Sequence, residues 1–250
     1  IMAARLANVE ALQNLRTQAA SRLDRRLGKC DGVADIMVCA GGGCVASGSS
    51  QLSAALRRLI QERGLEGRLQ VVETGCLGPC AVGPVAVMLP DGLLYERVKP
   101  QDASGLLDGI VSRLFAATPA LVSPSAANHE PLPISEAPFF QRQRKVVLRN
   151  CGVIDPTSIE EYIARDGYAA LAKALTRMTG DEVIEVLKHS GMRGRGGAGF
   201  LTGLKWSFTR KAVADTKYVL CNADEGDPGA FMDRSVLEGD PHAVIEAMAI

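Results

Sequence analysis

The fold of this protein is decided by two stretches, IMVCAGGGC at residues 36–44 and LQVVETGCLGPC at residues 69–80. Each begins with a short apolar, β-branched run and ends in two cysteines surrounded by glycine, which predicts a β-strand leading into each cysteine pair. Apolar residues at helical spacing predict an amphipathic helix between the strands, with a buried face made of Leu52, Leu56, Leu59 and Ile60. Because a strand-helix-strand crossover places its strands parallel and adjacent, both cysteine pairs are expected at one edge of a sheet.

These four cysteines are the candidate metal ligands: Cys39, Cys44, Cys76 and Cys80. Their C-x4-C and C-x3-C spacings differ from the C-x2-C of most structural zinc sites, whereas two thiolates from each of two loops suit a [2Fe-2S] cluster. Glycine lets the backbone pass close to the sulfurs. The alternatives are a zinc site, two disulfides or buried structural cysteines. Three scattered cysteines lack a partner at ligand spacing and are interpreted as small buried or reactive thiols: Cys30, Cys151 and Cys221.

The bulk composition narrows the class of protein. The chain has 250 residues, 47% of them hydrophobic, which is enough for two modest domains. Its 28 basic and 28 acidic residues cancel, so nucleic acid and anionic membranes are not favoured as main partners. No apolar run has the length of a membrane span and no secretory start is evident, so we expect a cytoplasmic protein. The helix-like run that closes the sequence, without a terminating signal, indicates a piece of a longer chain.

We expect an α/β fold with four consecutive regions. Residues 1–30 form an N-terminal helix, and residues 31–115 form an α/β domain with a thioredoxin-like order of elements. Residues 116–144 are a linker, because the segment is rich in proline, alanine and serine. Residues 145–250 form the first part of a second α/β domain.

In the second domain, residues 145–150 and 217–223 are predicted to be strands, the latter buried on both faces. Helices are predicted at residues 158–165, 168–176 and 181–190. Thr179 with Glu182 three residues later is typical of a capping box at the start of the last of these helices.

A glycine-rich motif, GRGGAGFLTGLKW, occupies residues 194–206. Its G-x-G-x-x-G match follows a helix instead of a strand, which is the wrong context for a dinucleotide fingerprint, and it lacks the GK[ST] of a P-loop. A flexible backbone beside basic residues could still approach a phosphate or a flat ring. The competing interpretation is a mobile glycine loop with solvated arginines.

A second polar motif, CNADEGDPG at residues 221–229, follows the predicted buried strand, where α/β sheets usually place ligand contacts. Asn222 can hydrogen-bond to a heterocycle edge. Its carboxylates can order water, ribose hydroxyls or a cationic ring: Asp224, Glu225 and Asp227. An exposed acidic turn is the alternative.

Together, GRGGAGFLTGLKW and CNADEGDPGAFMDR resemble the flavoprotein subunit of the complex I family of NADH dehydrogenases. The resemblance runs from about residue 146 onward. The front half resembles the thioredoxin-like [2Fe-2S] domain fused to that flavoprotein in NAD(P)-linked hydrogenases and formate dehydrogenases. The order of both modules and the stretch FFQRQRKVVLRNCGVIDP, residues 139–156, look closest to the hydrogenase type.

The resemblance implies a Rossmann-like domain that binds FMN and NAD(H) or NADP(H). It implies FMN or nucleotide contacts from Gly194, Arg195, Gly196, Gly197, Ala198, Gly199, Phe200, Gly203, Lys205, Phe208, Asn222, Asp224, Glu225 and Asp227. Phe200 and Phe208 fall where the family stacks the NADH adenine, and Asp227 falls near the meeting point of nicotinamide and flavin, where complex I commonly has glutamate. No side chain is assigned as a catalytic acid or nucleophile.

The implied function is electron transfer between NAD(P)H and iron-sulfur clusters through FMN, as a diaphorase-type subunit with other iron-sulfur subunits as partners. A [4Fe-4S] cluster is expected only outside these 250 residues, and the chain alone is expected to hold the [2Fe-2S] cluster but little or no FMN. One alternative is a non-catalytic [2Fe-2S] electron carrier or redox sensor. Within the class, a formate dehydrogenase or complex I subunit is the alternative to a hydrogenase.

Overall fold

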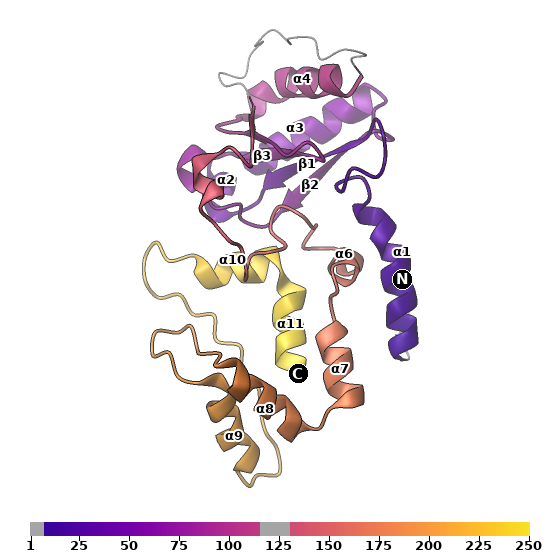
Figure 1. Cartoon of the computed structure of the whole chain (residues 1–250). Helices are drawn as coiled ribbons and strands as arrows, with labels where there is room; N and C mark the ends of the chain where they lie inside the picture. Colours follow the sequence, from indigo (N-terminus) through magenta and orange to yellow (C-terminus); the bar gives the residue numbers. More distant parts are fainter. Residues whose placement is uncertain (1–7, 116–130) are drawn as a thin grey trace. The chain divides into compact units, whose positions relative to one another are not determined.

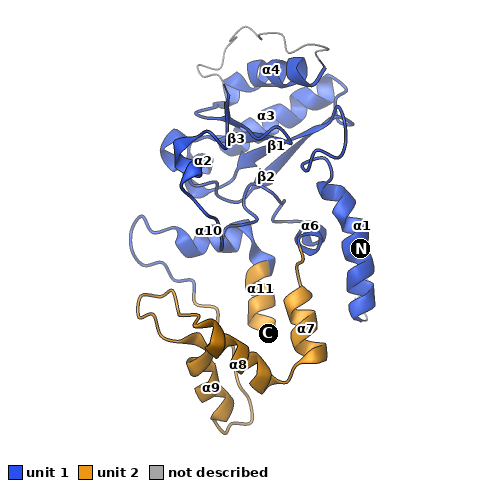
Figure 2. Ribbon diagram, viewed as in Figure 1, with its two compact units in different colours: residues 1–165, 223–242 blue, residues 166–222, 243–250 orange. Residues whose placement is uncertain are grey.

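The computed structural model describes residues 8–115 and 131–250, which divide into two units. One unit contains residues 1–165 and 223–242, and the other contains residues 166–222 and 243–250 (Figure 2). No helix in the described ranges combines the length and apolar character needed to cross a bilayer.

The first unit is built on a five-stranded sheet of order β2-β1-β3-β4-β5. Figure 1 labels its strands β1, β2 and β3. Its strands are β1 (Ala34–Cys39), β2 (Leu69–Thr74), β3 (Ala86–Leu89), β4 (Leu93–Tyr95) and β5 (Leu132–Pro133). β1 and β2 are parallel and pair Cys39 with Thr74, while the other pairings are antiparallel. The predicted parallel crossover is therefore confirmed. β5 comes from the range expected to be a linker, of which residues 116–130 lie outside the described residues.

Two helices pack on one face of this sheet, α3 (Ser49–Glu62) and α4 (Ala103–Phe115). The side chains of β1 alternate, as a strand requires: Ile36 and Val38 join Leu52 and Leu56 in the core under these helices. Met37 and Cys39 face the other side of the sheet, in a second apolar cluster. The alternation thus places Cys39 on the face opposite α3 and α4.

Short elements connect these strands and helices. They are α2 (Gly42–Ala46), the 3₁₀ turns η1 (Cys80–Val82) and η2 (Pro100–Asp102), and α5 (Pro138–Gln141). The predicted lead-in helix is present as α1 (Val9–Leu23), which packs against α6 (Ile159–Ala164). The last helix wholly inside this unit is α10 (Met232–Gly239).

The segment 145–150 is not a strand, so this prediction is wrong. Its residues form bends and turns, and the side chains of Val146 and Val147 are 65% and 57% exposed. The polar Asn150 is buried instead, and its Nδ2 donates to Asp240 at 2.7 Å. A strand needs a ladder partner, and side-chain anchors such as Asn150 hold this segment in its place.

The second unit contains the helices α7 (Ala169–Arg177), α8 (Gly180–Ser190) and α9 (Thr202–Lys211), together with most of α11 (Pro241–Ala249). The predicted capping box is confirmed, because Thr179 N–H donates to the Glu182 carboxylate at 2.7 Å while Glu182 N–H donates to the Thr179 hydroxyl at 3.3 Å. It fixes the first turn of α8.

The predicted strand at residues 217–223 is also absent. Tyr218, Val219 and Leu220 are 79%, 66% and 88% exposed, with no regular structure. From residue 145 onward, the described residues contain no strand apart from an isolated bridge between Arg193 and Leu201. A strand forms only with a pairing partner. The apolar pattern of residues 217–223 is therefore not enough to make this segment a strand. The α/β class is confirmed by the sheet of the first unit.

Candidate functional site

The four paired cysteines come together at one edge of the sheet in the first unit. Cys39 is the last residue of β1, and Cys44 lies in α2, the short helix that follows. Cys76 lies two residues after the end of β2, and Cys80 begins η1. Since Cys39 is paired with Thr74 across the sheet, the parallel register directs both loops to the same edge.

The two loops bring the four sulfurs into one region. A Cβ on Gly41 would lie 2.9 Å from the Cys76 sulfur, and a Cβ on Gly43 would lie 3.7 Å from the Cys80 sulfur. The Leu77 N–H donates to the Cys39 sulfur at 3.5 Å. Cys39 and Cys44 are buried, Cys76 is partly buried and Cys80 is exposed. The four thiols therefore extend from the surface into the second apolar cluster.

Contacts between the thiols shift their pKa values in opposite directions. Contact with the Cys39 thiol lowers the pKa of Cys44, and contact with the Cys44 thiol raises the pKa of Cys39. Contact with the Cys39 thiol raises the pKa of Cys76, and burial raises the pKa of Cys80.

Two glycines lie so close to the cysteine sulfurs that a side chain would not fit at either position. A Cβ on Gly41 would lie 2.9 Å from the Cys76 sulfur, and a Cβ on Gly83 would lie 2.9 Å from the Cys44 sulfur. Any side chain there would occupy space next to the thiols. The two loops therefore form a cradle that only glycine leaves open.

The donor set fits a binuclear cluster. All seven cysteines are free thiols, and the four paired ones, two from each loop at one edge of the sheet, would supply the four thiolates that a [2Fe-2S] cluster needs. Within the described ranges, no three His, Cys, Asp or Glu side chains form a group suited to a single metal ion. The four cysteines can hold a [2Fe-2S] cluster.

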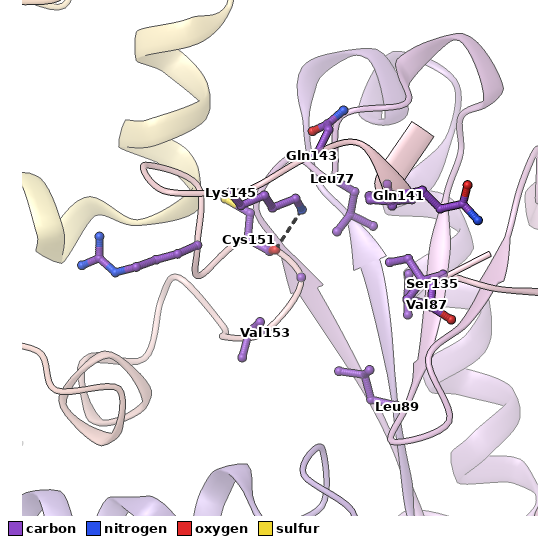
Figure 3. Close-up of a pocket in the computed structure, with 13 residues that line it drawn as sticks. Leu77, Val87, Leu89, Ser135, Gln141, Gln143, Lys145, Cys151 and Val153 are labelled. Carbon is purple, nitrogen blue, oxygen red and sulfur yellow. Dashed lines mark hydrogen bonds between the residues drawn. The ribbon is translucent and has the colours of Figure 1, made fainter. Parts of the chain in front are cut away.

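The sequence did not single out the groups that flank this site, Lys145 and Cys151. Cys151 is buried, with its sulfur against the backbone of Gly75, the residue before Cys76. Lys145 Nζ donates to the Cys151 carbonyl oxygen at 3.4 Å, in a pocket of about 410 Å³ that Leu77 also lines (Figure 3). The available signal was weak, since Lys145 is one of several basic residues in QRQRK at 141–145.

The glycine-rich loop belongs to the second unit. Its ends are tied by Gly194 N–H donating to the Phe200 carbonyl and Thr202 N–H donating to the Met192 carbonyl, both at 2.9 Å. Gly197 and Gly199 have φ values of 98° and 62°, which favour glycine. The residues of the loop expected to contact FMN are exposed, apart from the partly exposed Gly199: Gly194, Arg195, Gly196, Gly197, Ala198 and Phe200.

The other predicted contacts of this unit take different positions. The Phe200 and Phe208 rings lie 6.5 Å apart between centroids, are tilted by 46°, and are 49% and 57% exposed. Lys205 and Asn222 are exposed. Gly203 instead packs helices together, because its Cβ would lie 2.6 Å from the Lys188 backbone nitrogen in α8.

The acidic contacts, Asp224, Glu225 and Asp227, fall in the first unit. The Glu225 carboxylate accepts from the backbone N–H groups of Asp233 and Arg234 at 2.8 and 3.1 Å, at the start of α10. Desolvation raises the pKa of Glu225, but these N–H donors outweigh it and leave the pKa lowered. The predicted FMN residues are thus divided between the units, and Glu225 already caps a helix.

Two family models match separate parts of the chain. Residues 28–111 match the thioredoxin-like [2Fe-2S] ferredoxin family, which covers all four paired cysteines. Residues 187–250 match the Nuo51 FMN-binding domain, which covers both the glycine-rich loop and the acidic motif.

Curated relatives match over less than half of the chain. It is 62% identical over 110 residues to the HndC component of the NADP-reducing hydrogenase of Solidesulfovibrio fructosivorans, covering 44% of this chain and 22% of that protein. It is 54% identical over 105 residues to a component of the NADH-quinone oxidoreductase of Rhizobium meliloti, covering 42% and 25% respectively. The chain therefore spans about a quarter of the length of these relatives.

Two solved structures were also found. A thioredoxin-like [2Fe-2S] ferredoxin from Aquifex aeolicus is 27% identical, with 33% of this chain and 88% of that one covered and a TM-score of 0.31. An NAD+-reducing [NiFe]-hydrogenase is 21% identical, with 96% and 40% covered and a TM-score of 0.33. The two family models together show that residues 28–111 are similar to thioredoxin-like [2Fe-2S] ferredoxins and that residues 187–250 are similar to a Nuo51 FMN-binding domain.

Proposed function

We propose that this chain is part of an electron-transfer flavoprotein subunit that passes electrons between NAD(P)H and iron-sulfur clusters. The observation that carries the proposal is the placement of two cysteines from each of two loops at one edge of the sheet, within the segment that matches a [2Fe-2S] family. Cys39, Cys44, Cys76 and Cys80 are the proposed iron ligands. The match to a Nuo51 FMN-binding domain in the same chain supports a flavin as the redox neighbour.

The proposed FMN and nucleotide contacts are the residues named from the resemblance, from Gly194 to Asp227. FMN, when bound, supplies the exchange between two-electron hydride transfer and one-electron transfer. The chain's own contribution is to bind and orient: the exposed, tied glycine loop offers backbone N–H groups to a phosphate. The exposed Phe200 and Phe208 rings offer stacking surface.

We further propose a diaphorase role within a larger hydrogenase or dehydrogenase, with other iron-sulfur subunits as partners. The similarity to HndC and to NADH-quinone oxidoreductase components supports it. We place the protein in the cytoplasm, because cluster assembly needs cysteines kept as thiols and this compartment is reducing.

The test is anaerobic purification of the chain, with assays of iron, acid-labile sulfide, zinc and flavin, and spectra before and after NADH. About two irons and about two sulfides per chain are the expected result, because four ligands hold one [2Fe-2S] cluster. Zinc in place of iron would overturn the cluster assignment. The same assays on the natural subunit test the flavin: iron without flavin or NADH response there would support an electron carrier instead.

A further inference from the structure

Lys145 is a partly buried cation in the pocket of Figure 3, which Leu77 of the second cysteine loop also lines. Its Nζ donates to the Cys151 carbonyl oxygen at 3.4 Å and lies 5.5 Å from the centroid of the Phe140 ring. The Cys151 sulfur lies against the backbone of Gly75, the residue before Cys76, and Leu77, the residue after Cys76, lines the same pocket as Lys145. Lys145 is therefore held next to the loop that carries the proposed ligand Cys76.

The carbonyl that holds Lys145 is fixed relative to the cysteine loop. Gly152 N–H donates to the Thr74 hydroxyl at 2.8 Å, and this hydroxyl donates to the Ile154 carbonyl at 2.9 Å. Thr74 ends β2, two residues before Cys76. These two hydrogen bonds hold segment 150–154 to β2, the strand that leads into the proposed ligand Cys76. The Cys151 carbonyl, which accepts from Lys145, is therefore fixed near the same loop.

We propose that Lys145 tunes the [2Fe-2S] cluster by stabilising its reduced form. This inference rests on the proposed function, because it requires the cluster to be held by the four cysteines. A cluster with four thiolates carries net negative charge, and uptake of one electron makes that charge more negative. A fixed cation outside full solvent stabilises the more negative state and raises the reduction potential.

Other cations nearby are less suited to this role. Arg142, Arg144 and Arg149 lie in the same segment but are exposed, so water and salt screen them. Arg234 lies against Gly42 in the first cysteine loop, but its guanidinium is paired with Glu238 at 2.9 Å. Lys145 combines partial burial with a position next to the loop that carries Cys76.

The experiment is a potentiometric titration of the reconstituted 250-residue chain, with the reduced cluster followed by EPR and with dithionite as electron donor. The variants are Lys145→Arg, Lys145→Gln, Lys145→Met and Lys145→Glu. Arg144→Met is the matched control, since it removes one exposed positive charge from the same segment. Iron and sulfide are assayed in every sample, and circular dichroism checks the fold.

We expect the midpoint potential to shift negative in Lys145→Gln and Lys145→Met and further in Lys145→Glu, while Lys145→Arg and Arg144→Met stay near the wild type. The shifts should persist in high salt, because the charge is partly buried. An unchanged potential in loaded Lys145→Gln or Lys145→Met overturns the inference alone. A wild-type chain that takes up no cluster overturns the proposed function, and the inference with it.

If Lys145→Met and Lys145→Gln both lose the cluster, Lys145→Arg shows whether the positive charge or the packing of the lysine side chain is needed. Retained iron with a wild-type potential in Lys145→Arg supports the charge. Loss of the cluster in Lys145→Arg as well means that the lysine has a purely structural role, which also overturns the inference.

Discussion

The backbone of Gly75 lies against the backbone of Gly239, so closely that a Cβ on Gly75 would stand 2.5 Å from the Gly239 Cα. The same Cβ would stand 2.6 Å from the Cys151 sulfur. Gly75 precedes the proposed ligand Cys76, and Gly239 ends α10. The end of α10 and the second cysteine loop are therefore packed against each other without an intervening side chain.

Gly75→Ala should destabilise the first unit, because backbone atoms cannot move aside as a flexible side chain can. We expect a loss of about 1–3 kcal/mol, the usual cost of overpacking, and a reduced iron content, because the alanine would displace Cys76. Urea unfolding and iron assay measure both. Gly109→Ala is the control: that glycine lies within α4 with open space at its Cβ, so it should stabilise by about 0.5–1 kcal/mol.

Replacing any one proposed ligand by serine should abolish or change the cluster, because serine oxygen is a poor substitute for a thiolate on iron. Cys76→Ser removes a proposed ligand whose sulfur lies against Gly41 of the first cysteine loop, so it should have a strong effect. Cys30→Ser and Cys221→Ser, which remove exposed thiols that are not proposed ligands, should retain full iron content. Iron loss in these two controls equal to that in Cys76→Ser would contradict the ligand assignment.

A buried ion-pair network should be a large contributor to the stability of the first unit. Arg26 and Asp35 are 5% and 0% exposed, and Arg26 donates to Asp35 at 2.8 Å and to Glu161 at 3.0 Å. Glu161→Gln should cost about 3–5 kcal/mol, since it leaves a buried guanidinium partly uncompensated. Urea unfolding would show this, against Glu160→Gln as control, whose exposed partner Arg22 lies 4.0 Å away.

This network illustrates what the sequence could and could not predict. The parallel pair β1 and β2 follows from local apolar runs and one chirality rule, and this alone brings the two cysteine loops together. Arg26 and Glu161, in contrast, are 135 positions apart. No periodicity or spacing links two such residues, so their pairing is visible only in the fold.

The failed strand predictions have a related cause. Residues 145–150 and 217–223 have the apolar composition of buried strands, but a strand depends on a partner that its own composition cannot supply. Conversely, β5 contains only Leu132 and Pro133 and has no periodic signal, yet it pairs with β4 because the edge of that strand is available. The position of Lys145 next to the Cys76 loop could not be predicted either, since it depends on the hydrogen bond to the Cys151 carbonyl.

His242 should make the first unit less stable in mild acid. Burial lowers the pKa of His242 below its ordinary value, although the nearby Asp240 opposes the shift, and its ring stacks on Tyr162 at 5.6 Å. Above the ordinary pKa, about 6.5, both folded and unfolded states are neutral and the effect is absent. As the pH falls below it, the unfolded state binds the proton more readily, so stability is lost.

The measurement is the change in urea midpoint between about pH 7.5 and about pH 5.5, on either side of the ordinary histidine pKa. His242→Gln should reduce this change relative to the wild type. His189→Gln is the control, because His189 is exposed. An identical pH dependence in the wild type and His242→Gln would show that this histidine does not contribute.

The glycines of the second unit should separate into two classes. Gly203→Ala should destabilise the packing of α8 and α9 by about 1–3 kcal/mol, because its Cβ would meet the backbone of Leu187 and Lys188 at 2.9 and 2.6 Å. Gly196→Ala should stay within about 0.5 kcal/mol of the wild type, because its Cβ meets nothing within 4 Å. Hydrogen exchange of α8 and α9 in both variants measures this difference. If Gly196→Ala weakens FMN binding in the proposed longer subunit without faster hydrogen exchange in α8 and α9, Gly196 contributes to binding FMN. Equally faster exchange in both variants would show instead that the loop contributes to the packing of these helices.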